Sequence, residues 1–361
     1  MIRRLCFLFV VTGYVLSANK EIITSILTSS KWWLSQLTPI MYLSKQWEQE
    51  CWETWQLASN VVGERLTIPE IFVQDHPTGL NLAIEEKYGR NWRSKPLLLR
   101  GLWTSEQLSS TSRRLSVKGL LNEDLVIPYF KNASRSAELI PDASAPISDV
   151  VFNISELSMP HKIGTQLLGL KYPDLIYEVA PNKVVTDLFG PFFTPAMVRG
   201  FMNGWIPPIT VIPIFMAGTK TQTEENCTEG ELKNQPKTDL HCEPIANILV
   251  QLEGEKKITL VGPEYSSLLK PRLSPDGRAY VYSAITDGDL THVPRYEHQI
   301  QRGDGLYIPS WTWHRVDYTS GLALSASLFH FRPLDFFLRN SLYALVIIPN
   351  LILELTGTKS Q

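Results

Sequence analysis

The C-terminal half of this chain is a succession of short apolar segments, and this pattern limits the accessible folds more than any other feature. Most of these segments are rich in Val, Ile, Leu and aromatic residues and lie between turn-forming residues, which is typical of β-strands joined by turns. The predicted strands are residues 209–216, 247–252, 256–261, 279–284, 297–300, 305–308, 314–318 and 322–331. Such a series favours a double-sheet roll or a barrel. Because Glu253 and Gly254 predict a turn, we expect the two strands beside them to form a hairpin.

The N-terminal half adds predicted helices, so the fold class that we expect is mainly β with flanking helices (α+β). Residues 19–92 carry Trp and aliphatic residues at helical spacing and are expected to form a helical region. Residues 95–101 and 125–130 read as short buried strands. Further helices are expected at 104–124 and 197–205.

The extreme N-terminus has the pattern of a secretory signal. Arg3 and Arg4 precede an apolar run from Leu5 to Leu16, and small residues follow it, so residues 1–18 predict a signal peptide or a signal anchor. A buried N-terminal helix is the remaining alternative. Asn-x-Ser/Thr sequons at Asn132, Asn153 and Asn226 support a glycoprotein of the secretory pathway, in the endoplasmic reticulum lumen or secreted, but only weakly.

The C-terminal segment, residues 333–361, is apolar but interrupted. Arg339 and Pro349 break the run between Leu334 and Leu355, which therefore lacks the length to span a bilayer. We expect a helix or helix pair that packs on the domain or on a second copy in a homodimer. A membrane-surface helix is the alternative, so either terminus offers a membrane association.

Charge and cysteine content restrict the partners. The chain has 34 Lys and Arg against 36 Asp and Glu, a net charge of -2, so it carries no excess of positive charge for nucleic-acid binding. Removal of a signal peptide would leave Cys51, Cys227 and Cys242, an odd number that allows one internal disulfide at most.

Metal-binding chemistry is suggested by His241 and Glu243. On a strand these two side chains share a face while Cys242 points the opposite way, so they form two arms of a chelate. His314, which follows the strand at 305–308, is the candidate for the third arm. Two histidines and one carboxylate with open positions form the facial arrangement that suits non-haem Fe(II).

The residues around these ligands resemble the JmjC oxygenases of the cupin-like (cupin 8) type, and in particular the small JmjC protein hydroxylases. The similarity is specific in two blocks, 238–263, which begins Thr-Asp-Leu-His-Cys-Glu-Pro, and 302–314, which includes Gly-Asp-Gly-Leu-Tyr-Ile-Pro and Trp-His. It implies a JmjC/cupin-like domain at 93–332, with a double-stranded β-helix (jelly-roll) core at about 205–332.

The resemblance also implies an Fe(II)- and 2-oxoglutarate-dependent dioxygenase, which uses O2 to hydroxylate a protein side chain. His241, Glu243 and His314 would be the catalytic metal ligands, and Thr238, Asn247 and Lys256 would bind the cosubstrate. A non-catalytic cupin-fold binding protein, a JmjC lysine demethylase and a metal cupin enzyme that uses no 2-oxoglutarate remain alternatives.

The residues themselves favour Lys256 over Lys257 for the cosubstrate. On a strand Lys256 shares a face with Ile258 and Leu260, and a cation on an apolar inner face needs an anionic partner. A surface lysine beside a turn is the alternative interpretation.

Three features depart from the family pattern. Glu243 stands where Asp is usual, a polar insertion precedes Thr238, and Ser325-Ala326-Ser327 occupies a place where relatives often have Asn.

Several other residues invite functional interpretations that we set aside. We expect His292, His298 and His330 to be surface or structural residues, and Cys242 to be an inert core thiol. Arg302-Gly303-Asp304 spells an adhesion tripeptide but falls in a predicted turn.

Overall fold

The computed structural model describes residues 63–110, 112–122, 126–129, 143–147, 161–163, 175–189, 212–217, 237–273, 280–319, 322–340, 343–345, 347–348 and 350. The predicted signal segment, the three sequons, Cys6, Cys51, Cys227 and the end of the C-terminal segment lie outside these ranges.

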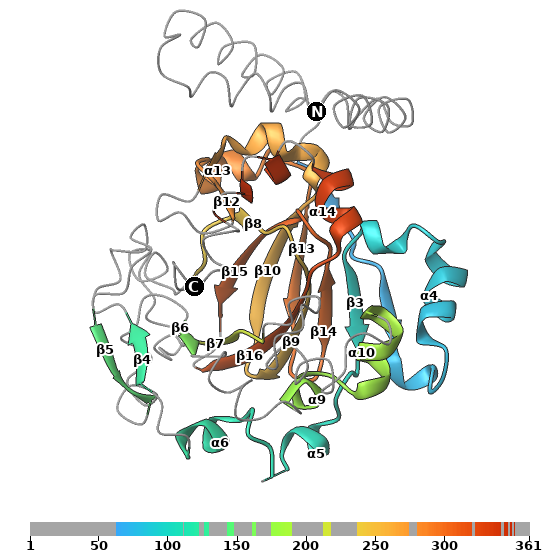
Figure 1. Ribbon diagram of the computed structural model, residues 1–361, viewed down its shortest axis with the longest axis vertical. Helices are drawn as coiled ribbons and strands as arrows, with labels where there is room; N and C mark the ends of the chain where they lie inside the picture. Colours follow the sequence, from blue (N-terminus) through green and yellow to red (C-terminus); the bar gives the residue numbers. More distant parts are fainter. Residues whose placement is uncertain are drawn as a thin grey trace, which may run out of the picture.

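Within the described residues, two seven-stranded sheets form the body of the protein (Figure 1). The first sheet, in spatial order, contains β1 (Arg65–Leu66), β13 (Arg295–Ile300), β10 (Lys256–Val261), β15 (Trp313–Tyr318), β8 (His241–Cys242), β12 (Val281–Ser283) and β11 (Pro271–Leu273). The second contains β2 (Glu70–Phe72), β3 (Leu97–Arg100), β14 (Gly305–Ile308), β9 (Ala246–Glu253), β16 (Ala323–His330), β7 (Ile214–Ala217) and β6 (His161–Ile163). A separate pair joins β4 (Val126–Tyr129) to β5 (Ala143–Pro146).

The helices lie outside the sheets. They are α4 (Leu80–Tyr88), α5 (Ser105–Leu108), α6 (Val117–Leu121), α9 (Ile176–Val179), α10 (Asn182–Phe189), α13 (Asp287–Leu290) and α14 (Pro333–Arg339), with 3-10 turns η1 (Val73–Asp75), η2 (Trp92–Ser94) and η7 (Pro263–Leu269). Figure 1 shows β8, β12, α13 and α14 at one end of the roll and α5, α6 and α9 at the other. Within the described residues, no helix is long and apolar enough to cross a membrane.

Three apolar clusters show how the strand alternation builds the layers. One cluster lies between the sheets and contains Leu249 of β9, Ile258 of β10 and Val316 of β15. A second covers the outside of the β9 sheet with α4, α9 and α10. The third covers the outside of the β10 sheet with α13, α14 and the residues that follow α14. Because alternate residues of a strand point to opposite faces, each central strand contributes to the interior and to one outer layer. This is a mainly β jelly-roll core with flanking helices, as the sequence predicts.

The predicted hairpin at Glu253 and Gly254 is wrong. β9 and β10 are consecutive in the chain, but β9 pairs with β14 and β16 whereas β10 pairs with β13 and β15. Gly254, at φ +65°, turns the chain from one sheet to the opposite sheet. A turn signal reports a change of direction and carries no information about which strand becomes the partner.

The predicted helical region 19–92 also needs a correction in the part that the structure describes. β1 pairs in parallel with β13 and β2 pairs in parallel with β3, so residues 65–72 extend both sheets. The Trp residues whose spacing predicts a helix lie nearer the N-terminus, before the described residues. The strands at 65–72 are too short to show a periodicity and are defined by their long-range partners.

The apolar C-terminal segment packs on this domain. Phe336 of α14, together with Tyr343 and Ile347, is buried against Trp311 and Trp313 on the outside of the β10 sheet. The described residues of this segment thus contribute to the outer layer of their own domain.

Candidate metal and cosubstrate site

Two of the three predicted metal ligands lie side by side on neighbouring strands. His241 of β8 and His314 of β15 are register partners, and their ring centroids are 4.2 Å apart. Opposite residues on paired strands project from the same face of a sheet. His314 alternates with Trp313, which is buried in the outer layer, so both imidazoles point into the roll. Pairing of two strands that are far apart in sequence thus brings the two histidines together.

The hydrogen bonds of these histidines define their tautomers. Nδ1 of His241 lies 2.7 Å from the carbonyl oxygen of Asp239, and Nδ1 of His314 lies 3.1 Å from that of Thr312. A carbonyl only accepts, so each Nδ1 carries the proton and each Nε2 is the basic nitrogen. Metal-binding histidines are commonly oriented by such a bond from the other ring nitrogen. The donor chemistry of this pair therefore fits a divalent metal.

The predicted carboxylate does not join the two imidazoles in this arrangement. Within the described ranges, no three His, Cys, Asp or Glu side chains are placed so that they could hold one ion together. β8 ends at Cys242, so the strand alternation that orients His241 does not extend to Glu243. The backbone carbonyl of Glu243 is held by the N–H of Trp311 at 2.7 Å. The main chain of Glu243 is thus held next to the histidines.

Trp311 has an unusual backbone conformation at this place. Its φ is +63°, in the left-handed region that non-glycine residues rarely adopt. The fully buried indole stabilises this conformation by donating from Nε1 to the carbonyl oxygen of Phe336 at 2.9 Å. Strained backbone of this kind is concentrated at functional sites. Here it connects the Glu243 carbonyl to the turn that leads into His314.

Lys256 lies inside the roll, and Lys257 lies outside it. Lys256 is 1% exposed, and its Nζ donates to the hydroxyl of Tyr318 at 3.2 Å and to the hydroxyl of Ser325. The Nζ also lies 4.4 Å from the centroid of the Tyr318 ring. Lys257 forms an ion pair with Glu297 at 3.3 Å on the opposite face. The structure therefore confirms the prediction that Lys256 and Lys257 point to opposite faces of their strand.

The charge of Lys256 has no counter-charge within the described part of the chain. Its contacts are with hydroxyl groups and aromatic rings, and none of the ion pairs formed there includes it. Burial lowers the pKa of Lys256 well below its ordinary value, and no nearby carboxylate offsets that effect. A buried amine in this state gains strongly from an anionic ligand.

Tyr318 was missed by the sequence reasoning, although a signal was present. His314, Val316 and Tyr318 alternate along β15 and so share the inner face with the metal-side histidine. Burial raises the pKa of Tyr318, so its hydroxyl stays protonated. Ser325, which stands where the family pattern often has Asn, accepts a hydrogen bond from the amine of Lys256.

Asn247 faces the interior at the metal end of β9. It is 6% exposed and lies between Ile308 of β14 and Phe329 of β16 in the register. Its Oδ1 is buried without a hydrogen-bond partner among the described residues, and so is Oγ of Ser327 on the neighbouring strand. Two orphaned polar atoms on this inner face are suited to a polar ligand.

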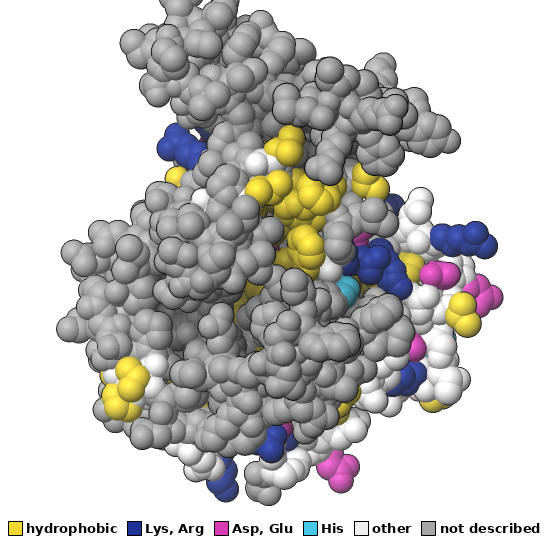
Figure 2. All heavy atoms as spheres, in the orientation of Figure 1, with side chains coloured by type: hydrophobic (Ala, Val, Ile, Leu, Met, Phe, Trp, Pro, Cys, Tyr) yellow, Lys and Arg dark blue, Asp and Glu magenta, His cyan; other side chains and the backbone are white. Residues whose placement is uncertain are grey.

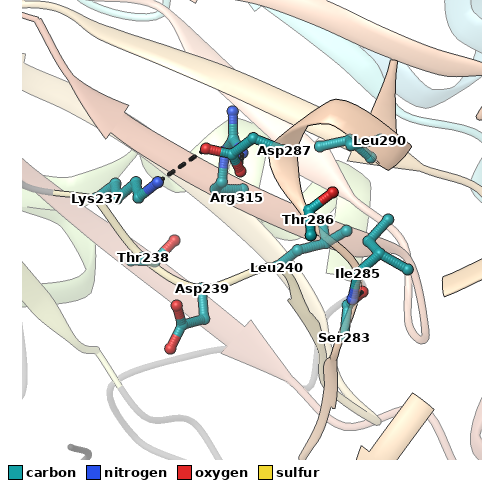
Figure 3. Close-up of a pocket in the computed structure, with 10 residues that line it drawn as sticks. All are labelled: Lys237, Thr238, Asp239, Leu240, Ser283, Ile285, Thr286, Asp287, Leu290 and Arg315. Carbon is teal, nitrogen blue, oxygen red and sulfur yellow. Dashed lines mark hydrogen bonds and ion pairs between the residues drawn. The ribbon is translucent and has the colours of Figure 1, made fainter. Parts of the chain in front are cut away.

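Thr238 occupies a different setting from the one expected. Its Oγ1 accepts a hydrogen bond from the N–H of Val316 at 2.9 Å, and the residue lines a small pocket (Figure 3). That pocket also contains Arg315, which alternates with the inward-facing His314 and therefore lies on the outer face of β15. Asp287 bridges Lys237 and Arg315 across it, at 3.0 and 2.6 Å. The role of Thr238 in cosubstrate binding stays a prediction.

Other sequence interpretations are resolved by burial. Cys242 is a free, fully buried thiol, and burial raises its pKa well above the ordinary value, as expected for an inert core residue. His292 is exposed, and His330 is buried on the outer side of β16. Asp304 of the adhesion-like tripeptide is only 7% exposed and binds Arg100 at 2.6 Å.

Comparison with known proteins agrees with this architecture. Residues 214–335 match the family model of the cupin-like domain, a family that includes 2-oxoglutarate oxygenases. The tRNA wybutosine-synthesizing protein 4 of Emericella nidulans is 30% identical over 100 residues, which are 27% of this chain and 9% of that protein. The protein of the same name from Aspergillus fumigatus is 28% identical over 100 residues, which are 27% of this chain and 10% of that protein. The matched part thus spans about a tenth of the length of these curated relatives.

Proposed function

Because residues 214–335 are a cupin-like domain of the JmjC-related type, we propose that this protein is an Fe(II)- and 2-oxoglutarate-dependent oxygenase that hydroxylates a protein side chain. The proposal rests on the interior of the roll, where an imidazole pair and a buried amine share one face of the β10 sheet.

The observation that carries the proposal is the buried, uncompensated amine of Lys256. A cation at 1% exposure is costly unless an anion joins it, and the distal carboxylate of 2-oxoglutarate is such an anion. Leu260 is the register partner of His314, and Lys256 precedes Leu260 by four residues. At a strand rise of about 3.3 Å per residue, the backbone of Lys256 lies roughly 13 Å along the sheet from the level of His314. If the side chains of Lys256 and His314 reach toward each other, the gap between them has the size of a five-carbon dicarboxylate.

Each residue then has a defined task. His241, His314 and Glu243 would hold Fe(II), with Glu243 joining the imidazoles through rotation of its side chain. When bound, the iron supplies O2 activation, coupled to decarboxylation of 2-oxoglutarate to succinate and CO2. The Nδ1 hydrogen bonds orient both rings, and Lys256, with the hydroxyls of Tyr318 and Ser325, holds the distal carboxylate. The surrounding aliphatic side chains exclude water and so strengthen these interactions.

A protein is the substrate class that we propose, in the secretory pathway. The N-terminal pattern and the sequons support this location, and a secreted or luminal protein is a more accessible substrate there than a histone. The names of the two fungal relatives refer to tRNA, but the net charge of -2 provides no surplus of cations for an RNA substrate.

Succinate release tests the proposed reaction. The full chain is incubated aerobically with Fe(II), ascorbate and 2-oxoglutarate, since uncoupled turnover needs no protein substrate. We expect a signal that depends on iron and falls at least 100-fold in His241→Ala and His314→Ala. His292→Ala, at an exposed histidine, is the matched control and should keep the wild-type rate.

Succinate release, together with calorimetry and an anaerobic spectrum, separates the proposal from its alternatives. A non-catalytic cupin-fold binding protein would bind 2-oxoglutarate, as measured by calorimetry, and release no succinate. A metal cupin enzyme of another class would bind Fe(II) without a change in its spectrum on anaerobic addition of 2-oxoglutarate. Either result contradicts the proposed activity.

A further inference from the structure

The inner face of the β10 sheet continues past the two histidines toward an edge of that sheet. β8 is followed in the sheet by β12 and then by β11, which is its last strand among the described residues. Tyr282 of β12 is the register partner of His241, and Arg272 of β11 is the register partner of Tyr282. Because register partners project from the same face of a sheet, these two side chains extend the row that begins with His314 and His241.

The neighbouring buried residues confirm the direction of this row. Val281 of β12 and its register partner Cys242 are both fully buried in the apolar layer outside the β10 sheet. Since alternate residues of a strand point to opposite faces, Tyr282 points to the inner face. Tyr280 lies close by, and its ring meets that of His241 edge-on at a centroid distance of 5.5 Å. Two tyrosines therefore adjoin the histidine pair on the β12 side.

Exposure distinguishes the two sides of the histidine pair. On the β10 side, Lys256 is 1% exposed and His314 is 8% exposed. On the β12 side, His241 and Tyr282 are partly exposed, and Arg272 is exposed. A small ligand held by Lys256 is thus enclosed, whereas the side open to a larger molecule is the one formed by β12 and β11.

Arg272 supplies an unpaired charge at the far end of this row. Its guanidinium forms no hydrogen bond or ion pair within the described part of the chain. The three other arginines on the described strands of this sheet, Arg65, Arg295 and Arg315, are all paired with carboxylates. A guanidinium has five N–H donors in a planar fork that matches a carboxylate, so Arg272 is available to an acidic partner.

Apolar surface is present at the same end of the roll. Figure 1 places β8, β12 and α14 at this end, and the space-filling view of Figure 2 shows hydrophobic side chains gathered there. Phe337 and Leu338 of α14 are 48% and 42% exposed. Contiguous apolar surface of this kind is typical of places where another protein packs.

We propose that Tyr280, Tyr282 and Arg272 form the surface that recognises the protein substrate, and that the substrate segment carries an acidic residue that pairs with Arg272. This inference rests on the proposed oxygenase function and specifies its substrate further. Tyrosine and arginine are enriched at protein interfaces, and a guanidinium binds a carboxylate through paired hydrogen bonds. One unpaired guanidinium does not neutralise a polyphosphate backbone, so the row favours a peptide over RNA.

The strand spacing predicts where the acidic residue lies in the substrate. β11 is two strands away from β8, and neighbouring strands are about 4.8 Å apart, so the backbones of Arg272 and His241 lie roughly 10 Å apart. An extended peptide advances about 3.3 Å per residue. A substrate segment that crosses these strands therefore places its acidic residue about three positions from the residue that is hydroxylated, and the flexible arginine side chain allows about two to four.

A degenerate peptide library tests this surface. The full chain is incubated with Fe(II), ascorbate, 2-oxoglutarate and random peptides that lack Met and Cys, and peptides that gain one oxygen atom are sequenced by mass spectrometry. We expect Asp and Glu to be enriched at least 3-fold at two to four positions from the hydroxylated residue. Arg272→Gln should remove this enrichment. Arg272→Glu should replace it with an enrichment of Lys and Arg at the same positions, because only direct contact transfers a reversal of charge.

Two further variants complete the experiment. Arg65→Gln is the matched control: Arg65 lies on β1 at the opposite edge of the same sheet and is 73% exposed, so its products should keep the wild-type preference. Tyr282→Ala removes a ring beside the histidines and should raise the KM for the peptide pool at least 5-fold. This second readout remains informative if the Arg272 variants fail to fold.

The inference is overturned if the wild-type products show no acidic enrichment, or if Arg272→Glu keeps the wild-type preference. Transfer of oxygen to a single-stranded RNA oligomer, and to none of the peptides, overturns it as well. Succinate measured in the same reactions separates this inference from the proposed function. Succinate release without a peptide preference rejects the recognition surface alone, whereas no succinate from wild type rejects the oxygenase and this surface with it.

Discussion

Replacement of Lys256 by Met is the sharpest test of how the interior binds its cosubstrate. The change keeps the length of the side chain and removes the amine that contacts the hydroxyls of Tyr318 and Ser325. In the proposed complex this amine pairs with a carboxylate away from water. Loss of one partner of a desolvated, hydrogen-bonded charge pair costs about 2–5 kcal/mol.

The two hydroxyls reduce the expected effect, because both remain able to donate to the carboxylate in the variant. We therefore expect a loss near the lower end of that range, about 3 kcal/mol, which corresponds to an increase of roughly 150-fold in the Kd for 2-oxoglutarate. The assay is anaerobic calorimetry in the presence of Mn(II) as a redox-inactive metal, with the Tm of each variant measured as a control for folding.

Lys257→Met is the matched control. Lys257 is the next residue on the same strand, but its side chain is 42% exposed and pairs with Glu297 on the outer face. Exposed ion pairs contribute about 0–1 kcal/mol, and this pair does not contact the interior, so the Kd should change less than about 2-fold. Equal Kd values for wild type and Lys256→Met, or equal losses in both variants, would refute the assignment.

Protonation provides a second readout of the same interaction. Burial lowers the pKa of Lys256 in the free protein, and a bound carboxylate raises it again. Binding should therefore take up protons, and affinity should fall as the pH rises above the lowered pKa. Calorimetry in buffers of different ionisation enthalpy measures this uptake, and Lys256→Met should abolish it.

Three further predictions concern the scaffold. Gly303→Ala should lower the free energy of unfolding in urea by roughly 3 kcal/mol, because φ is +91° and a Cβ would meet the carbonyl oxygen of Trp103 at 2.4 Å. Gly288→Ala is the control: the nearest atom to its added Cβ lies at 3.7 Å, so the free energy of unfolding should change by less than about 1 kcal/mol. Cys242 should react with thiol reagents only after unfolding, as mapped by mass spectrometry, and modification of the native protein would contradict its burial. Burial lowers the pKa of His330 to about 4, so protonation of this imidazole favours the unfolded state. The free energy of unfolding should therefore fall by about 3 kcal/mol as the pH drops from 6.5 to 4. His330→Gln should remove this pH dependence, and an unchanged dependence in the variant would refute the assignment.

Local pattern was sufficient for the identity of most strands and for the faces of key residues. Alternation along 256–261 separates Lys256 from Lys257 without any knowledge of the partner strands. The same rule places Cys242 in the apolar layer outside the β10 sheet and His241 on the face that points into the roll. These predictions succeed because the period of a strand is a property of the backbone itself.

Pairing between distant segments was decided by the tertiary structure. The turn at Gly254 suggests a hairpin, yet it carries the chain from one sheet to the other, and the parallel pairing of residues 65–72 has no local signature. The approach of His241 to His314 depends on β8 joining β15, and the support of Lys256 by Ser325 depends on β16 reaching across the roll. Which strands become neighbours is determined by the burial of both sheets at once, and that free energy belongs to the whole fold rather than to any one segment.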